Sequence, residues 1–147
     1  MANQPSLLNG QMLMTPTGPA PKTYQPPCVC EGCKVPKGWG EELIIENNEF
    51  YCGKLLIFKK GCKFSMHYHM IKDETWYVQS GLFLYRYVDT RDATIVQVTL
   101  NPGDVVRQRP GQPHQLEAVE DGIVFEVSTH HEDDDSFRVW KGDSQKK

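Results

Sequence analysis

The sequence places two histidines and a glutamate close together and a third histidine much later in the chain. His67 and His69 are separated by one residue, so on a β-strand their side chains share a face, because side chains alternate with a period of two. Glu74 follows at a distance that suits a short turn returning a carboxylate to the same point. Two imidazoles and a carboxylate can bind one divalent metal ion and leave positions open for water, substrate or dioxygen. In a closed sheet, His114 could supply a fourth ligand from a facing strand.

The chain after residue 37 alternates short apolar or β-branched runs with turn residues. The runs cover residues 43–45, 54–59, 75–78, 82–88, 94–100, 105–107, 114–119 and 123–128. This rhythm is typical of an all-β sandwich or barrel, and no window shows a helical apolar period. Ser80-Gly81, between two of the runs, predicts a β-hairpin.

The first 36 residues differ in composition from the rest. They hold seven of the ten prolines and only three charged side chains, so they cannot form regular helix and have little apolar material with which to fold alone. We interpret residues 1–36 as a Pro-rich N-terminal arm, residues 37–140 as one barrel domain and residues 141–147 as a polar tail. Apolar residues of the arm could dock on a second subunit, and disorder of the arm is the alternative. Because edge strands of such a barrel also invite pairing, a homodimer is expected.

Composition excludes several classes of protein. Sixteen basic and nineteen acidic side chains leave the 147-residue chain with a net charge of −3, which argues against nucleic-acid binding. No apolar run approaches the roughly 20 residues that span a bilayer, and no signal peptide is recognisable, so no membrane partner is expected.

The five cysteines are an odd number without an export signal, which favours free thiols in the cytoplasm. Three of them, Cys28, Cys30 and Cys33, lie within six residues and could bind zinc if Cys52, Cys62 or a partner chain completed the set. Free thiols in an arm are the alternative. His130-His131, followed by four acidic residues, is interpreted as a solvated turn.

Two spaced motifs resemble those of the cupin superfamily. Residues 61–81 read G-x5-H-x-H-x4-E-x6-G, and residues 103–114 read G-x7-G-x2-H. The second motif departs from the usual one at Pro110, which stands one position late, and at Ala118, where Asn is common. The resemblance implies an all-β fold, a conserved β-barrel or jelly roll, with one divalent metal ion inside it. Mn, Fe, Co, Ni and Zn all suit the implied ligands, which are His67, His69, Glu74 and His114.

A narrower resemblance is to the cupin domains of type II mannose-6-phosphate isomerases. It rests on residues 37–43, on residues 65–69 followed by 74–76, and on residues 126–129 followed by an acidic run and Arg138. His67 stands where that group has Gln, Gln115 where a basic residue is frequent, and residues 107–109 replace a more apolar strand. The resemblance implies a sugar or sugar-phosphate isomerase.

Ketose–aldose isomerisation moves a proton between adjacent carbons while a divalent metal stabilises the developing oxyanion. Glu126 and Lys54, on strands that could face the interior, are candidates for carrying the proton. Arg107 and Arg109 could hold a phosphate or carboxylate, and two solvated charges are the alternative.

Trp76 and Tyr85 could stack on a sugar ring, and core packing is the alternative for both. The same metal ligands would also suit an iron-dependent oxygenase of the cupin type. A non-catalytic small-molecule binding or sensing module is the third possibility.

Overall fold

The computed structural model describes residues 7–8, 11–12 and 31–146. The chain divides into two units, Met1–Cys30 and Glu31–Lys147. In the first unit, β1 (Leu7–Leu8) and β2 (Gln11–Met12) form a small antiparallel pair. Most of the predicted arm, including Cys28 and Cys30, lies outside the described residues, so docking of the arm and a zinc site there stay predictions.

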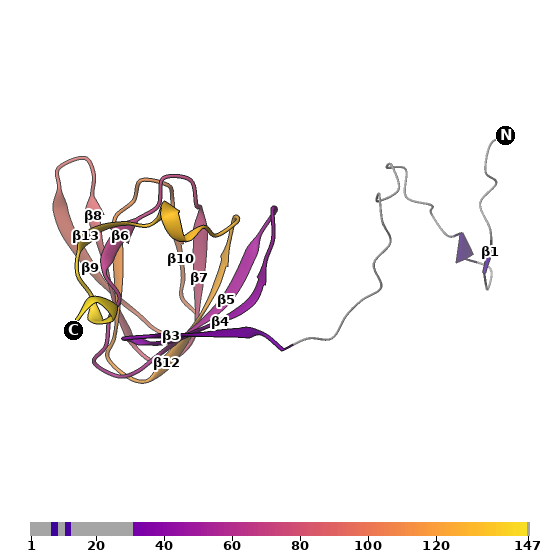
Figure 1. Cartoon of the computed structure of the whole chain (residues 1–147), viewed down its shortest axis with the longest axis horizontal. Helices are drawn as coiled ribbons and strands as arrows, with labels where there is room; N and C mark the ends of the chain where they lie inside the picture. Colours follow the sequence, from indigo (N-terminus) through magenta and orange to yellow (C-terminus); the bar gives the residue numbers. More distant parts are fainter. Residues whose placement is uncertain (1–6, 9–10, 13–30, 147) are drawn as a thin grey trace. The chain divides into compact units, whose positions relative to one another are not determined.

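The second unit is an all-β jelly roll made of two antiparallel sheets, as expected (Figure 1). One sheet has the order β10-β7-β12-β5-β4-β3, and its strands are β3 (Cys33–Lys37), β4 (Gly40–Asn47), β5 (Cys52–Phe58), β7 (Glu74–Ser80), β10 (Val105–Gln108) and β12 (Gly122–Ser128). The other has the order β13-β6-β11-β8-β9, and its strands are β6 (Met66–Tyr68), β8 (Phe83–Asp89), β9 (Thr94–Leu100), β11 (His114–Ala118) and β13 (Phe137–Trp140). Two short 3-10 helices, η1 (Asp133–Asp135) and η2 (Asp143–Gln145), follow near the C-terminus.

The inward faces of the strands change from apolar to charged along their length. On β5, Phe58 and Leu56 point into the core, and Lys54 is the next buried position. On β12, buried Val124 is followed by buried Glu126. The apolar end supplies the cohesion, at about 1.5–3 kcal/mol for each large side chain removed from water. The other end of the same sandwich therefore holds ionisable groups away from solvent.

The hairpin predicted at Ser80-Gly81 is wrong, because β7 and β8 belong to different sheets. β7 pairs with β10 and β12, and β8 pairs with β9 and β11. Gly81 has a positive φ of 85°, and an added Cβ would lie 2.6 Å from the Cα of Gly122. Glycine at position 81 thus allows the chain to pass close to the start of β12 as it crosses from one sheet to the other. The pairing of distant strands, and not the local turn signal, decides which sheet β8 joins.

The barrel domain also extends beyond residues 37–140. Cys33–Lys37 forms the edge strand β3, where Pro36 is tolerated because only one side of the strand is paired. The predicted tail is attached by η2, since the backbone N–H of Lys63 donates to the Asp143 carboxylate (2.6 Å) and that of Gly38 donates to Ser144 Oγ (3.1 Å). In the described segments, no helix is long and apolar enough to cross a membrane.

Candidate metal centre and its cavity

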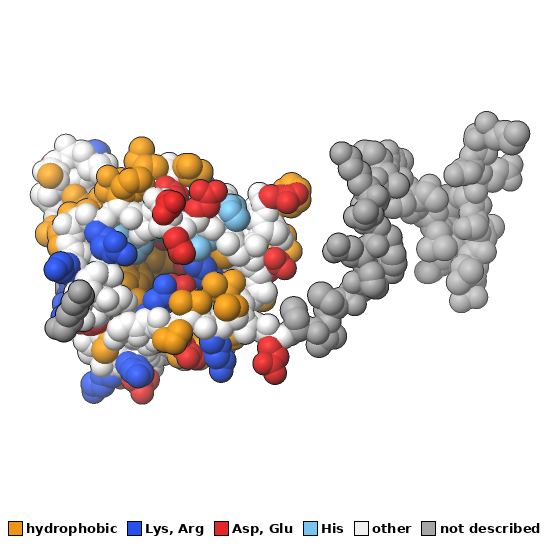
Figure 2. Space-filling model, in the orientation of Figure 1, with side chains coloured by type: hydrophobic (Ala, Val, Ile, Leu, Met, Phe, Trp, Pro, Cys, Tyr) orange, Lys and Arg blue, Asp and Glu red, His pale blue; other side chains and the backbone are white. Residues whose placement is uncertain are grey.

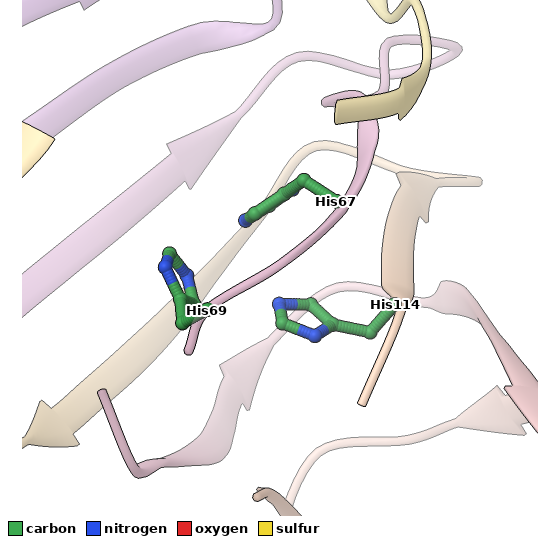
Figure 3. Close-up of side chains that lie close together, drawn as sticks. All are labelled: His67, His69 and His114. Carbon is green, nitrogen blue, oxygen red and sulfur yellow. The ribbon is translucent and has the colours of Figure 1, made fainter. Parts of the chain in front are cut away.

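Three histidines from two neighbouring strands converge. His67 lies on β6, His69 directly follows β6, and His114 begins β11, where it is the cross-strand partner of His67. One nitrogen of each ring lies within 4.8 Å of the other two, and the rings face a common point (Figure 3). Three nitrogens bound at about 2.1 Å to one ion would be about 3 to 3.5 Å apart, so small ring rotations would close the site.

The backbone fixes the tautomer of each ring. Nδ1 of His67 lies 2.8 Å from the carbonyl oxygen of Ser65, Nδ1 of His114 lies 2.8 Å from that of Gln112, and Nδ1 of His69 bonds to that of Asp135. A carbonyl oxygen only accepts hydrogen bonds, so Nδ1 carries the proton in each ring and Nε2 keeps its lone pair. This is the arrangement in which histidine binds metals.

Glu74, at the start of β7, faces the same point. Its Oε1 lies 2.9 Å from Nε2 of His114 and 3.8 Å from Nε2 of His69. Within the described chain, Oε1 of Glu74 and Nε2 of His114 are buried without a hydrogen-bond partner. A divalent ion bound by both atoms would satisfy them, as would a proton on Nε2 of His114. The residues present therefore fit a divalent ion, and His67, His69, Glu74 and His114 would hold it.

Electrostatics keep these ligands ready for a metal. Burial, together with the neighbouring His114, lowers the pKa of His67 to about 3, and burial also lowers the pKa of His69. Burial alone would raise the pKa of Glu74, but the Lys72 ammonium that donates to it holds the pKa well below its usual range. At neutral pH, His67 and His69 are neutral and Glu74 is ionised.

Lys72 lies between two carboxylates inside the cavity. Its Nζ is 2.5 Å from Oε2 of Glu74 and 2.5 Å from Oε1 of Glu126, and only 4% of its side chain is exposed. Burial alone would lower the pKa of Lys72, but Glu126 and Glu74 raise it above its ordinary value, so the group stays an ammonium. Lys72 is not among the residues predicted from the sequence; its place between the expected ligands His69 and Glu74 is the signal that could have found it.

A second missed residue, Asp135 in η1, holds the loop that carries Lys72. Its carboxylate accepts hydrogen bonds from the backbone N–H groups of Met70 (2.7 Å), Ile71 (3.2 Å) and Lys72 (2.9 Å). Its carbonyl oxygen accepts from His69. The last of the three consecutive aspartates is thus buried and positions the metal centre.

The metal centre opens into a cavity of about 390 Å³. Figure 2 looks at the opening, where acidic, basic and histidine side chains surround a hollow. Glu126, Lys54 and Trp76 line this cavity, where the sequence analysis expected substrate to bind. Their chemical roles stay predictions.

The other predicted substrate residues are not among the lining residues. Tyr85 is buried in the core, and its hydroxyl donates to Oε1 of Gln108 (2.5 Å). Arg107 and Arg109 are exposed, and Arg107 forms a two-pronged ion pair with Asp73 (2.6 and 2.9 Å). Arg107 therefore lies in the solvent-exposed surroundings that the alternative interpretation described. To bind substrate, Arg107 would first have to break its ion pair with Asp73.

The turn after β12 is only partly solvated, contrary to our interpretation. His131 lines the cavity, and 19% of its side chain is exposed. The Asn47 side chain anchors it by donating to the carbonyl of His131 (3.0 Å) and accepting from its N–H (2.9 Å). This clamp, made by a residue far away in the sequence, brings His131 to the rim.

Comparison with known families identifies the fold. Residues 54–130 match the family model described as a cupin domain, and this stretch covers more than half of the chain and includes all four expected ligands. The chain is a cupin. No curated protein matches this cupin.

Solved structures share the fold at low sequence identity. The capsular polysaccharide assembling protein CapF from Staphylococcus aureus is 19% identical over 75% of this cupin and 32% of CapF, with a TM-score of 0.66. KdgF from Halomonas sp. is 22% identical over 64% of this cupin and 81% of KdgF (TM-score 0.56), and oxalate decarboxylase from Bacillus subtilis is 18% identical over 74% and 30% (TM-score 0.64). This cupin spans about a third of the length of CapF and of the decarboxylase.

Proposed function

We propose that this cupin is a divalent-metal-dependent enzyme that moves a proton between adjacent carbons of a small hydroxycarbonyl compound, with a sugar or sugar phosphate as substrate. One observation carries the proposal. A buried ammonium, Lys72, is held between a prospective metal ligand, Glu74, and a cavity carboxylate, Glu126. The narrower resemblance to type II mannose-6-phosphate isomerases supports the substrate class.

The residues that line the cavity have different roles in such a reaction. A divalent ion would supply Lewis-acid stabilisation of the substrate oxygen that gains negative charge. Glu126 takes the proton from one carbon and returns it to the next, since it lines the cavity and is not one of the expected ligands. Lys72 donates to Glu126 and orients it, and its second hydrogen bond positions Glu74. Trp76 and Phe64 form apolar walls that limit the access of water.

Hydrogen exchange in heavy water tests the proposal directly. Metal-free protein is loaded separately with Mn(II), Fe(II), Co(II), Ni(II) or Zn(II) and incubated with free sugars and sugar phosphates. NMR should show deuterium entering at the carbon next to the carbonyl. Glu126→Gln should slow exchange by about 100-fold or more. Glu120→Gln, an exposed carboxylate outside the cavity, is the matched control.

Other outcomes would overturn the proposal in favour of the alternatives. If the Fe(II) protein consumes dioxygen with a thiol or enol and exchanges no deuterium, the chemistry is that of an oxygenase. If no substrate turns over but one sugar raises the melting temperature, the protein is a binding or sensing module.

A homodimer is part of this proposal. On the outer face of the six-stranded sheet, a row of apolar side chains lies in register across five strands: Leu43, Leu55, Phe125, Tyr77 and Val105. Tyr77 is 45% exposed and Val105 is 63% exposed. A twofold axis would pack this row against its own copy. Light scattering should give a dimer for the wild type and a monomer for Tyr77→Glu, and a wild-type monomer would contradict it.

We also place the protein in the cytoplasm. The described cysteines, Cys33, Cys52 and Cys62, are free thiols, which suits a reducing compartment. Alkylation at cell lysis followed by mass measurement should block all five thiols. A pair that reacts only after reduction would contradict this location.

A further inference from the structure

We propose that the cavity beside the metal centre contains an oxyanion site in which Lys54, Lys37 and Arg138 bind a phosphate or carboxylate group of the substrate. The proposal rests on the proposed function in one respect, which is that substrate occupies this cavity. It differs from the sequence expectation, which gave this task to Arg107 and Arg109. It also gives Lys54 a binding role rather than the proton-carrying role predicted for it.

The charges that line the cavity are unequally paired. Four cations and four carboxylates line it: Lys37, Lys54, Lys72, Arg138, Glu42, Glu74, Glu126 and Asp133. Lys72 bridges Glu74 and Glu126, so these three charges are paired with one another. Asp133 is 97% exposed and contacts His131. The remaining lining residues therefore include three cations and one effective counter-charge, Glu42.

Glu42 is shared between two ammonium groups. Its Oε2 lies 3.5 Å from Nζ of Lys54, and its Oε1 lies 3.6 Å from Nζ of Lys37. Both distances are too long for good hydrogen bonds. Arg138, on β13, forms no side-chain ion pair or hydrogen bond within residues 31–146, and it lines the same cavity. Each of the three cations thus has unused donor capacity.

Lys54 is the strongest sign of a ligand. Its side chain is 2% exposed, yet its ammonium donates no hydrogen bond to the described residues. Its one ion pair among them, to Glu42 at 3.5 Å, leaves donors of the ammonium free for an acceptor oxygen of a ligand in the cavity. A phosphate or carboxylate oxygen would supply this acceptor and would be shielded from competing salt by the burial.

The strand register places this site beside the reacting groups. Lys54 on β5 is the cross-strand partner of Glu126 on β12, and Glu126 is in turn paired with Trp76 on β7. Adjacent strands are about 4.8 Å apart, so Lys54 is one strand from the proposed proton carrier and two strands from β7, which begins with Glu74. A small molecule anchored by its anion at Lys54 would extend across Glu126 toward the metal centre.

Anion titration of metal-free, full-length protein tests the site without any turnover, because phosphate cannot then bind to a metal ion. Calorimetry should show saturable binding of inorganic phosphate or of acetate, and no binding of glucose. Whichever of the two anions binds more tightly indicates whether the charged group of the substrate is a phosphate or a carboxylate. Lys54→Met should weaken binding about tenfold or more, as expected for loss of a charge-assisted hydrogen bond. Lys60→Met, an exposed lysine that is not a lining residue, should bind as the wild type does.

A second variant guards against misfolding of the first. Lys37 and Arg138 lie at the rim, so Lys37→Met/Arg138→Met should fold, as circular dichroism would verify, and still lose affinity. The oxyanion site is wrong if neither phosphate nor acetate binds at millimolar concentration. It is also wrong if the wild type and both variants bind the anion equally. If anions bind as expected but no substrate exchanges deuterium, the site stands and the proposed reaction fails. If uncharged sugars exchange and no anion binds, the reaction stands and the site fails.

Discussion

Replacement of Asp135 by alanine offers a sharp test of how the metal centre is held. The carboxylate accepts from the N–H groups of Met70 (2.7 Å) and Lys72 (2.9 Å), with Ile71 close behind (3.2 Å). Met70 and Ile71 are exposed, so water can replace the carboxylate there, whereas Lys72 is buried and its N–H would lose its partner. We expect a loss of about 1.5–2 kcal/mol at Lys72 and about 0.5–1 kcal/mol at the other two, or about 2–3 kcal/mol in all.

Urea denaturation of the metal-free protein measures this loss, provided that the slope of unfolding free energy with urea is unchanged. Asp134→Ala is the matched control, since this neighbour is exposed and its side chain has no hydrogen bond or ion pair in the described structure. Asp135→Ala should also broaden the visible spectrum of bound Co(II), because η1 no longer holds the carbonyl that orients His69. If Asp134→Ala and Asp135→Ala unfold within about 0.5 kcal/mol of each other, the reasoning is refuted.

Three further perturbations have defined outcomes. Lys72→Met should cost about 3–5 kcal/mol in urea unfolding, because two buried carboxylates lose their counter-ion, and Lys72→Arg should recover part of it; equal stability of both variants and the wild type would contradict the network. The pKa of His67 is depressed to about 3 from 6.5, so its stabilising contribution is present above pH 6.5 and is lost as the pH falls toward 3. The urea midpoint of His67→Gln should therefore fall less between pH 7 and pH 4 than that of the wild type, and parallel curves would contradict this. Gly40 has a φ of 148°, and an added Cβ would lie 1.9 Å from the carbonyl oxygen of Ile57. Gly40→Ala should thus lower the melting temperature by an amount equivalent to about 3 kcal/mol, and Gly53→Ala, whose Cβ would meet nothing within 4 Å, should not; similar melting temperatures would show that β4 adapts.

The sequence predicts the features that depend on local periodicity. Alternation and turn residues locate most strands, and the i, i+2 spacing of His67 and His69 places both on one face. The convergence of His114 follows from the resemblance of the two motifs, and the structure supplies its geometric reason, which is direct pairing of His114 with His67.

The features that escape prediction depend on contacts between distant segments. Lys72 is buried by Glu126, and Asp135 by residues 70–72, so neither has a local signature. Charge alone also fails to tell which face a residue occupies. Arg107 turns outward to Asp73, whereas Lys54, on a strand of similar appearance, turns inward. The Ser80-Gly81 signal likewise describes a bend but cannot say which strand the chain will pair with next.

Each of the three imidazoles is oriented by a main-chain carbonyl oxygen. Every residue type has this oxygen, so a side-chain substitution does not remove it. Side-chain substitutions at Ser65 or Gln112 would leave those oxygens in the chain. Such a centre tolerates mutation in its surroundings better than one whose orienting groups are themselves side chains. Residues of the cavity wall can therefore be exchanged during evolution while the three imidazoles keep their orientation.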